Sequence, residues 1–444
     1  MDRAISRVDG EALRAKTMRK ITRRIVPLLV VGYIVSYIDR INVSFAKFGM
    51  EETFGMSATQ YGFVAGIFFV GYVLAEVPSN IIMTKVGARI WLSRILVTWG
   101  IIATLTAFAV NVEMVYVLRF LLGVAEAGFF PGILVYLTRW YPNAERTKVI
   151  STVMVAIPVA SVLGSPLNGW ILDTFDGALG LDGWRWVFIV GGIPAVLLGV
   201  VFFVALTESP TQARWLDDAE RAWLSETLEA EQAERALSAP AGHRAALRNK
   251  RVIALCLAYF LLLCGAYPLA YWMPTVVKEV GHGLSSTQIG WLSAVPFLLA
   301  AIGMYVTGRL VRNERSSRPV LIALGISVLA FLVTALALGS PLLAFAAITV
   351  ATMAAQTAKP LFWAVPTAYL AGVGAASGIA LINSLGNAAG FVSPYAFGWI
   401  KDASGGRTGF AIAVMIFANV GALLVIGGLA ARARARRAST VPTA

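Results

Sequence analysis

Long apolar runs separated by short polar segments dominate the chain. Twelve such runs can be drawn, at residues 25–46, 60–82, 90–110, 114–138, 149–171, 186–206, 252–275, 288–308, 319–338, 342–370, 377–400 and 408–431. Each approaches or exceeds the roughly twenty residues that a helix needs to cross a bilayer core of about 30 Å. The pattern therefore predicts an all-α polytopic membrane protein with twelve transmembrane helices.

The connections divide these runs into two sets of six. Most are short, whereas residues 207–251 form one long segment, so we expect an N-terminal half at 1–206, a linker at 207–251 and a C-terminal half at 252–444. Apolar residues recur at helical spacing within the linker, namely Trp215, Leu216, Ala219, Trp223, Leu224 and Leu228. This spacing predicts an amphipathic helix at the membrane interface. We interpret it as a connector, with a regulatory site as the alternative.

A short sequence repeat relates the two halves. Ser165-Pro166 precedes Gly-Trp-Ile-Leu-Asp at 169–173, and Ser393-Pro394 precedes Gly-Trp-Ile-Lys-Asp at 398–402. The two matching stretches are 229 positions apart, about half the chain. Parallel six-helix halves with a central site near the midplane are a transporter architecture.

The basic residues are distributed unequally between the loops. Of the 37 Lys and Arg residues, 29 fall on the side of the two termini, 5 fall on the opposite side, and Arg40, Arg119 and Lys359 lie within spans. Such a bias marks the basic side as cytoplasmic. We therefore expect both termini in the cytoplasm of a cell with the protein in its inner membrane. The net charge of +13 is then a topology signal, and no nucleic-acid partner is expected.

Composition supports the membrane assignment and gives no enzyme chemistry. The chain is 58% hydrophobic and 14% charged, whereas soluble domains carry about 25% charged residues. Cys256 and Cys264 are about 12 Å apart on one predicted helix, too far for a disulfide. His243 and His282 fall in loops, and a phosphate-binding loop is missing. We expect no metal, no cofactor and no removable signal peptide.

Charged residues inside the spans are candidates for function because burying them is costly. Asp39 and Arg40 are neighbours in the first span, and neighbours on a helix point about 100° apart. Arg40 can therefore face an anion while Asp39 faces another cation or a proton path. The alternative is that both are anchors at the membrane edge.

Arg119 and Glu126 lie seven residues apart in the fourth span, hence on one helix face, with Gly123 between them. A glycine there lets a neighbouring helix approach closely. A carboxylate away from water can bind and release protons, so Glu126 is our leading proton-coupling residue. Alternatively, Glu126 neutralises Arg40 or Arg119. Glu76, beside Pro78, is interpreted as structural.

Lys359 stands deep in the tenth span, before Pro360, Trp363 and Pro366. The prolines break the helical hydrogen bonding and expose carbonyls beside a cation and an aromatic ring. A buried ammonium needs a counter-ion, which a substrate carboxylate can provide. The alternatives are snorkelling to the surface and pairing with a fixed acid.

Uncharged polar side chains add further candidates. Asn383 and Asn387 are one turn apart in the eleventh span, and amides suit hydroxyl and carboxyl oxygens. Tyr267 and Tyr271 share a face of the seventh span, as Tyr37 does with Tyr33 in the first. Helix packing is the alternative for all of them.

Several motifs together resemble one family. They are Tyr37-Ile-Asp39-Arg40-Ile-Asn42, Glu76-Val-Pro78-Ser-Asn80, Arg119…Gly123…Glu126-Ala-Gly128-Phe-Phe-Pro131, Gly183-Trp184-Arg185-Trp186, Phe362-Trp363-Ala-Val-Pro366 and Asn383-Ser-Leu-Gly386-Asn387. From about residue 18 to 430 the sequence is similar to the anion:cation symporter family of the major facilitator superfamily, which includes tartrate, phthalate, hexuronate and galactonate transporters.

This resemblance implies the twelve-helix major facilitator fold and import of an organic anion with protons by alternating access. It implies proton handling by Asp39 and Glu126, and substrate contact by Arg40 and Asn383. The chain departs from the superfamily's Gly-x-x-x-Asp-Arg-x-Gly loop, because residues 80–87 and 308–312 lack the acid. That departure puts the charge-relay lock between states in doubt. The unusual Lys359 points to a dicarboxylate, and we expect a monomer.

Two rival functions remain open. An anion exchanger or uniporter of the same fold would use the buried acids for structure. A membrane sensor or receptor would need a folded signalling domain, for which the 45-residue linker and the short tails leave no room.

Overall fold

The computed structural model describes residues 2–237, 249–310, 316–363, 365–366 and 375–438. Within these ranges the chain is helical apart from turns and connections, and it contains no strand. The N-terminal half comprises α1 (Asp2–Phe54), α2 (Ala58–Val86), α3 (Ala88–Thr106), α4 (Val112–Glu126), α5 (Phe129–Thr138), α6 (Asn143–Met154), α7 (Ala156–Thr174) and α8 (Gly183–Ala205), with the 3₁₀ turn η1 (Ala178–Gly180).

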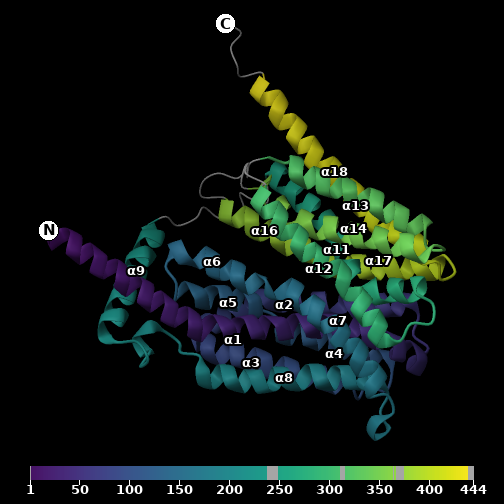
Figure 1. Ribbon diagram of the computed structural model, residues 1–444, viewed down its shortest axis with the longest axis horizontal. Coiled ribbons are helices and arrows are strands. Elements are labelled where there is room, and N and C mark those ends of the chain that lie inside the picture. Colours follow the sequence, from purple (N-terminus) through teal and green to yellow (C-terminus); the bar gives the residue numbers. More distant parts are fainter. Residues whose placement is uncertain (1, 238–248, 311–315, 364, 367–374, 439–444) are drawn as a thin grey trace.

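The 3₁₀ turn η2 (Pro210–Gln212) and α9 (Asp218–Leu237) follow. The C-terminal half comprises α11 (Lys250–Val280), α12 (Ser286–Leu310), α13 (Arg318–Leu336), α14 (Pro341–Phe362), α16 (Ala375–Asn387), α17 (Ala389–Ala403) and α18 (Thr408–Ala438). The halves form two bundles, purple to teal and green to yellow in Figure 1. The domain boundaries after residues 206 and 251 stay a prediction.

Eleven segments of the described chain are long and apolar enough to cross a membrane. The expected span at 377–400 is present as α16 and α17, which meet at Ala388 and are each too short alone. The fourth span is also broken, since Gly128 adopts a left-handed φ of 86° between α4 and α5. A residue with a side chain is strained in that conformation. The end of the expected tenth span lies partly outside the described residues.

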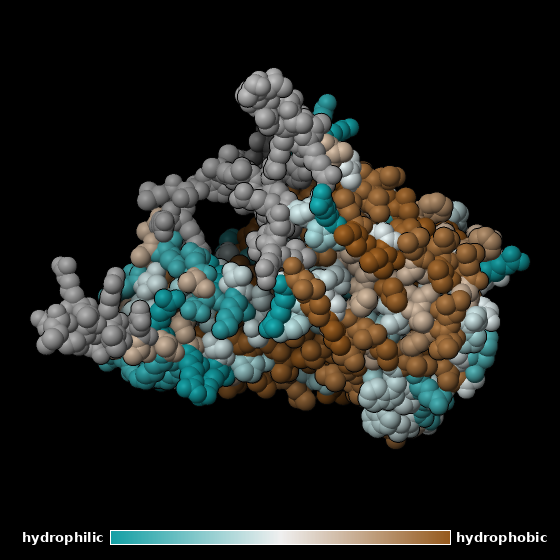
Figure 2. Space-filling model, turned by 45° about the horizontal axis from the view of Figure 1, so that its top comes forward, coloured by the Kyte–Doolittle hydropathy of each residue, from teal (hydrophilic) through white to brown (hydrophobic). Residues whose placement is uncertain are grey.

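On the face that Figure 2 shows, a belt of exposed apolar side chains lies between two polar ends. Exposed apolar side chains occur on helices of both halves, among them Leu197, Val204, Leu329, Leu336 and Phe417, each more than half exposed. An apolar surface of this extent in a soluble protein would aggregate, whereas a bilayer solvates it. The belt therefore marks the membrane-embedded part of the helices.

The linker helix exists, but its apolar face differs from the expected one. Trp215 and Leu216 precede α9 instead of lying within it, and Ala219 is exposed in its first turn. Leu216 and Leu224 are buried, and Trp215 stacks on Trp140 with ring centroids 5.4 Å apart. The apolar side chains of this segment therefore pack on the N-terminal half. The end of the linker lies outside the described residues.

The two halves meet through symmetry-related helix pairs, α7 with α12 and α2 with α17. The Asp173 carboxylate accepts hydrogen bonds from the backbone N–H groups of Ser286 and Thr287, at 3.1 and 2.7 Å, where α12 begins. In the same way Asp402 accepts from Ala58 and Thr59, at 3.2 and 2.7 Å, where α2 begins. The repeated Gly-Trp-Ile-x-Asp stretches thus cap a helix of the opposite half.

These caps lie at one end of the bundle. We call it the far end, and the end where α9 packs on α1 the terminal end. From the far end the halves diverge toward the terminal end in Figure 1. The bundle is therefore closed at the far end.

Candidate functional site

The Glu126 carboxylate is the centre of a buried polar cluster in the N-terminal half. It ends α4 and has no exposed side-chain surface. Its Oε1 accepts three hydrogen bonds, from Ser36 Oγ at 2.6 Å, Arg40 Nε at 2.9 Å and Arg40 Nη2 at 2.6 Å. Glu126 is therefore the partner of Arg40, as one of the two sequence interpretations proposed.

Aromatic rings surround the Arg40 guanidinium. Its carbon lies 5.0 Å from the ring centroid of Tyr37, 5.4 Å from Phe68 and 5.3 Å from Tyr72. Ring faces attract a cation within about 6 Å of their centroid. The Arg40 side chain nevertheless keeps 16% of its surface exposed, whereas Glu126 has none. Arg40 is thus held in place with part of its surface still accessible to a ligand.

Asp39 points away from this pair, as the angle between helical neighbours predicts. It is buried where α1 passes Gly191 of α8, and neither carboxylate oxygen has a hydrogen-bond partner among the described residues. Arg119 is also fully buried, and its Nε donates to the Val64 carbonyl at 3.4 Å. Asp39 and Arg119 are therefore two buried charged residues of the N-terminal half that lie outside the Arg40–Glu126 pair.

Gly123 has the packing role expected from the sequence. A Cβ there would collide with the Phe68 carbonyl oxygen, and one at Gly71 would collide with the Phe120 carbonyl oxygen. The two glycines allow α2 and α4 to approach closely. This approach brings Phe68 beside Arg40.

In the C-terminal half, Tyr267 contacts two other predicted residues, Asn387 and Lys359. Its hydroxyl donates to Asn387 Oδ1 at 3.2 Å, and the Lys359 ammonium lies 5.8 Å from its ring centroid. Lys359 is half-buried and has no ion-pair partner among the described residues. Trp363 lies nearby, with its ring 5.0 Å from that of Tyr259. Lys359 therefore carries a charge that no described acid neutralises.

Two adjacent phenylalanines join the Arg40 cluster to the Tyr267 cluster. Phe68 contacts Arg40, and Phe69 lies 4.9 Å from Tyr267 and 6.2 Å from Tyr271, centroid to centroid. The two phenylalanine rings are 5.3 Å apart. An aromatic contact thus joins the Arg40 cluster of the N-terminal half to the Tyr267 cluster of the C-terminal half.

The remaining predicted residues differ from one another in exposure and in the contacts that they make. Asn383 is exposed, and Arg119 is sealed inside the N-terminal half. Tyr271 is buried, and its carbonyl accepts from the Tyr61 hydroxyl at 2.6 Å, which is a contact between the halves. The roles of all these residues stay predictions.

Sequence reasoning missed two polar groups. Ser36 binds Glu126 and stands one helical turn before Arg40, a spacing that could have revealed it. Glu208 accepts from the backbone N–H groups of Ala88 and Arg89, both at 2.9 Å, and also binds Arg139. Glu208 therefore supplies a carboxylate at the loop after α2, where the expected acid is absent. It comes from the segment after α8, which the motif comparison did not cover.

The described residues contain no group of three potential metal ligands, and Cys256 and Cys264 are free and buried. The site therefore consists of charged, aromatic and amide side chains held between two helical bundles.

Comparisons with known proteins agree with this architecture. Residues 29–394 match the family model of the Major Facilitator Superfamily. A protein named "Putative tartrate transporter" from Agrobacterium vitis is 45% identical over 399 residues, which cover 89% of this chain and 88% of that protein. A "Quinolone resistance transporter" from Acinetobacter baumannii is 40% identical over 408 residues, covering 90% of this chain and 92% of that protein.

Among solved structures, a bacterial homolog of the human lysosomal transporter Spinster, in an inward-facing and occupied conformation, has a TM-score of 0.72. It is 18% identical and covers 92% of this chain and 96% of its own. This likeness supports the twelve-helix fold.

The chain is therefore a multi-pass membrane transporter, not an enzyme. It belongs to the Major Facilitator Superfamily.

Proposed function

We propose that this transporter imports a small organic carboxylate, namely a hydroxy acid, dicarboxylate or sugar acid, by proton symport with alternating access. It would work as a monomer in the inner membrane with both termini in the cytoplasm, the orientation that the positive-inside bias favours. The observation that carries the proposal is the Arg40–Glu126 pair, in which a partly exposed cation is held by a fully buried acid.

An organic anion fits the charges of the site. Arg40 presents a guanidinium, whose planar fork matches a carboxylate better than an ammonium does. Lys359 offers a second cation in the other half, so a substrate with two carboxylates can contact both. The name of the 45% identical relative, with tartrate as its substrate, supports the same class.

Competition for Arg40 provides a coupling mechanism. While Glu126 is ionised, it holds Arg40 through two hydrogen bonds and competes with a substrate carboxylate. A proton on Glu126 removes that charge, so Arg40 is free to bind the substrate. When the proton leaves, Glu126 recovers Arg40 and the substrate is released. Binding of the anion and of the proton would therefore favour one another.

Alternating access is supported by where the halves meet. Asp173 and Asp402 join them at the far end, and each cap can be broken without disturbing the helices of its own half. A conformation open at the far end requires both caps to break. The closed far end described here is then one of two states.

Glu126→Gln tests the coupling. Purified protein in proteoliposomes is supplied with tartrate, first with an acidic outside and then by exchange against internal tartrate without a gradient. We expect the variant to lose pH-driven uptake at least tenfold yet retain exchange, because a permanently neutral residue permits loading but cannot release a proton.

Glu76→Gln is the matched control, since Glu76 is a half-buried acid on α2 that forms no ion pair among the described residues. It should retain both activities. If wild-type uptake ignores the pH gradient and internal substrate stimulates it, the protein is an exchanger or uniporter, and the proton proposal is wrong.

A further inference from the structure

A basic cavity of about 700 Å³ opens at the terminal end, away from the Arg40 site. It is lined by Ala15, Lys16, Arg19, Lys20, Arg23, Arg24 and Trp215. All except Trp215 belong to α1, at the three- and four-residue spacings that place side chains on one helical face. Five cations therefore share one concave surface.

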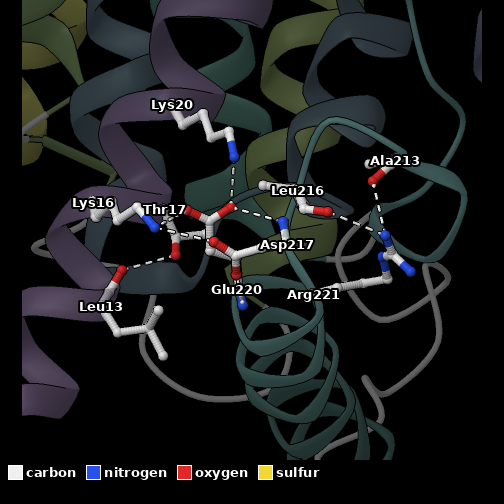
Figure 3. A network of polar contacts seen from close by, with 9 residues as sticks. All are labelled: Leu13, Lys16, Thr17, Lys20, Ala213, Leu216, Asp217, Glu220 and Arg221. Carbon is white, nitrogen blue, oxygen red and sulfur yellow. Dashed lines mark hydrogen bonds and ion pairs between the residues drawn. The ribbon is translucent and has the colours of Figure 1, made fainter.

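Two of these cations are already paired. The Lys16 ammonium lies 3.0 Å from an Asp217 oxygen and 3.3 Å from Glu220, and Lys20 lies 2.8 Å from Glu220. Figure 3 shows both lysines reaching the segment at the start of α9. These ion pairs hold one wall of the cavity against α1.

The other three cations are arginines without such a partner. Among the residues that the structure describes, no acid forms an ion pair with any of Arg19, Arg23 and Arg24. All three are exposed. The unneutralised charge of the cavity is therefore three guanidinium groups, and guanidinium forks bind phosphate oxygens in pairs.

One of these arginines is positioned by aromatic packing. The Arg24 guanidinium lies 5.2 Å from the ring centroid of Trp215. Trp215 is itself fixed, since it stacks on Trp140 and its indole N–H donates to Thr207 Oγ1 at 3.2 Å. One wall of the cavity is therefore ordered. Basic residues that serve only to orient the protein in the membrane would not need such fixed positions.

The surface next to the cavity is apolar on its membrane side. Pro27 and Val31 follow Arg24 on the same face of α1, and both are exposed, Val31 to 46%. A soluble phosphate has no apolar part that could contact this strip, whereas the acyl chain of a lipid can lie along it. Basic pockets at the ends of membrane helices bind anionic lipid headgroups.

We propose that this cavity binds the phosphate headgroup of an anionic phospholipid from the leaflet at the terminal end. Arg19, Arg23 and Arg24 contact the phosphate, Trp215 lies at the level of the headgroup, and an acyl chain follows Pro27 and Val31. The site is independent of the transported substrate.

Native mass spectrometry of the detergent-purified protein tests the proposal, with phosphatidylglycerol and phosphatidylcholine as probes. The wild type should retain phosphatidylglycerol in preference to phosphatidylcholine. The triple variant Arg19→Gln, Arg23→Gln and Arg24→Gln should lose that retention at least tenfold, and Arg24→Gln alone severalfold. Gel filtration confirms that each variant is folded.

The control triple variant is Lys85→Gln, Lys148→Gln and Arg318→Gln. It removes the same charge from exposed positions at the terminal end that lie outside the cavity. It should bind phosphatidylglycerol like the wild type. Equal losses in both triple variants would show nonspecific charge attraction and overturn the site. Displacement of the lipid by equimolar inorganic phosphate or glycerol phosphate would assign a soluble anion instead.

Discussion

At the scale of single residues, the Arg40–Glu126 pair is both a structural element and a candidate for coupling. Breaking a buried ion pair by removing one partner costs about 3–5 kcal/mol, because the other charge remains buried alone. Glu126 has no exposed surface, so it depends on Arg40 and Ser36 for compensation. The same dependence makes the pair sensitive to a proton or to a competing anion.

Arg40→Gln should therefore lower the melting temperature of the purified protein, because ionised Glu126 loses its partner. The double variant Arg40→Gln with Glu126→Gln should recover part of that loss, since no unpaired charge remains. Differential scanning fluorimetry measures both. A double variant whose loss equals the sum of the two single losses would show that the residues do not interact.

Lys359→Met should weaken binding of a dicarboxylate about tenfold or more, equivalent to about 1.4 kcal/mol, because one carboxylate loses its cation. Binding of a comparable monocarboxylate should change little. Calorimetric titration with tartrate and lactate compares the two. If the affinities for tartrate and lactate fall equally, Lys359 does not bind the second carboxylate.

Residue patterns predicted part of this site. The angle between Asp39 and Arg40 on one helix, and the close approach at Gly123, follow from helix geometry, and the structure agrees with both. The sequence left open whether Glu126 neutralises Arg40 or Arg119, because that choice depends on how α1 packs against α4. Glu208 was missed for the same reason, since its partners are distant in sequence, whereas the spacing of Ser36 to Arg40 on α1 was a signal that could have been used.

At the scale of elements, several helices are capped by carboxylates from segments that are distant in the sequence. Asp173, Asp402 and Glu208 each accept hydrogen bonds from two backbone N–H groups where another helix begins. Those N–H groups lack partners within their own helix, and the helix dipole favours negative charge there. Two of these caps join the halves, so they stabilise the state that is closed at the far end.

Asp173→Asn combined with Asp402→Asn should favour opening at the far end. The measurable quantity is the reaction rate of a cysteine introduced at Ser293, a fully buried residue between the halves, with an impermeant thiol reagent. We expect the rate to rise severalfold. Asp176→Asn is the control, because Asp176 caps Gly183 within its own half. If the cysteine reacts at an unchanged rate in the double variant, the two caps do not hold the far end closed.

The contact between α1 and the start of α9 should weaken in acid. The backbone N–H of Glu220 and the Lys16 ammonium hold the pKa of Asp217 below its ordinary value. Burial raises the pKa of Glu220, but hydrogen bonds from Lys20, the Asp217 backbone and Lys16 outweigh it and lower the pKa overall.

Because both pKa values are lower in the folded protein, the stabilisation is complete above the ordinary carboxyl pKa of about 4 and is lost as pH falls through the lower folded values. Hydrogen exchange of α9 should therefore accelerate only below about pH 4. In Asp217→Asn with Glu220→Gln, exchange should be fast at neutral pH and should lose this dependence. A pH-independent wild type would contradict the prediction.

At the scale of the whole molecule, hydropathy was enough to predict an all-helical bundle of about twelve spans. It did not predict that α16 and α17 meet at Ala388, or that α4 ends at Glu126 before Gly128, because local breaks leave the apolar pattern unchanged. The repeated Gly-Trp-Ile-x-Asp stretch indicated two related halves. Its use as a pair of caps between them depends on the packing of α7 on α12 and α2 on α17, which no local pattern encodes.

The most direct test of proton-coupled carboxylate transport follows protons and substrate together. Proteoliposomes containing the wild-type protein and an internal pH-sensitive dye are given external tartrate without an initial pH gradient. We expect the interior to acidify as tartrate enters, and we expect no acidification with Glu126→Gln. Uptake of tartrate by the wild type without any change in internal pH would contradict the proposed coupling.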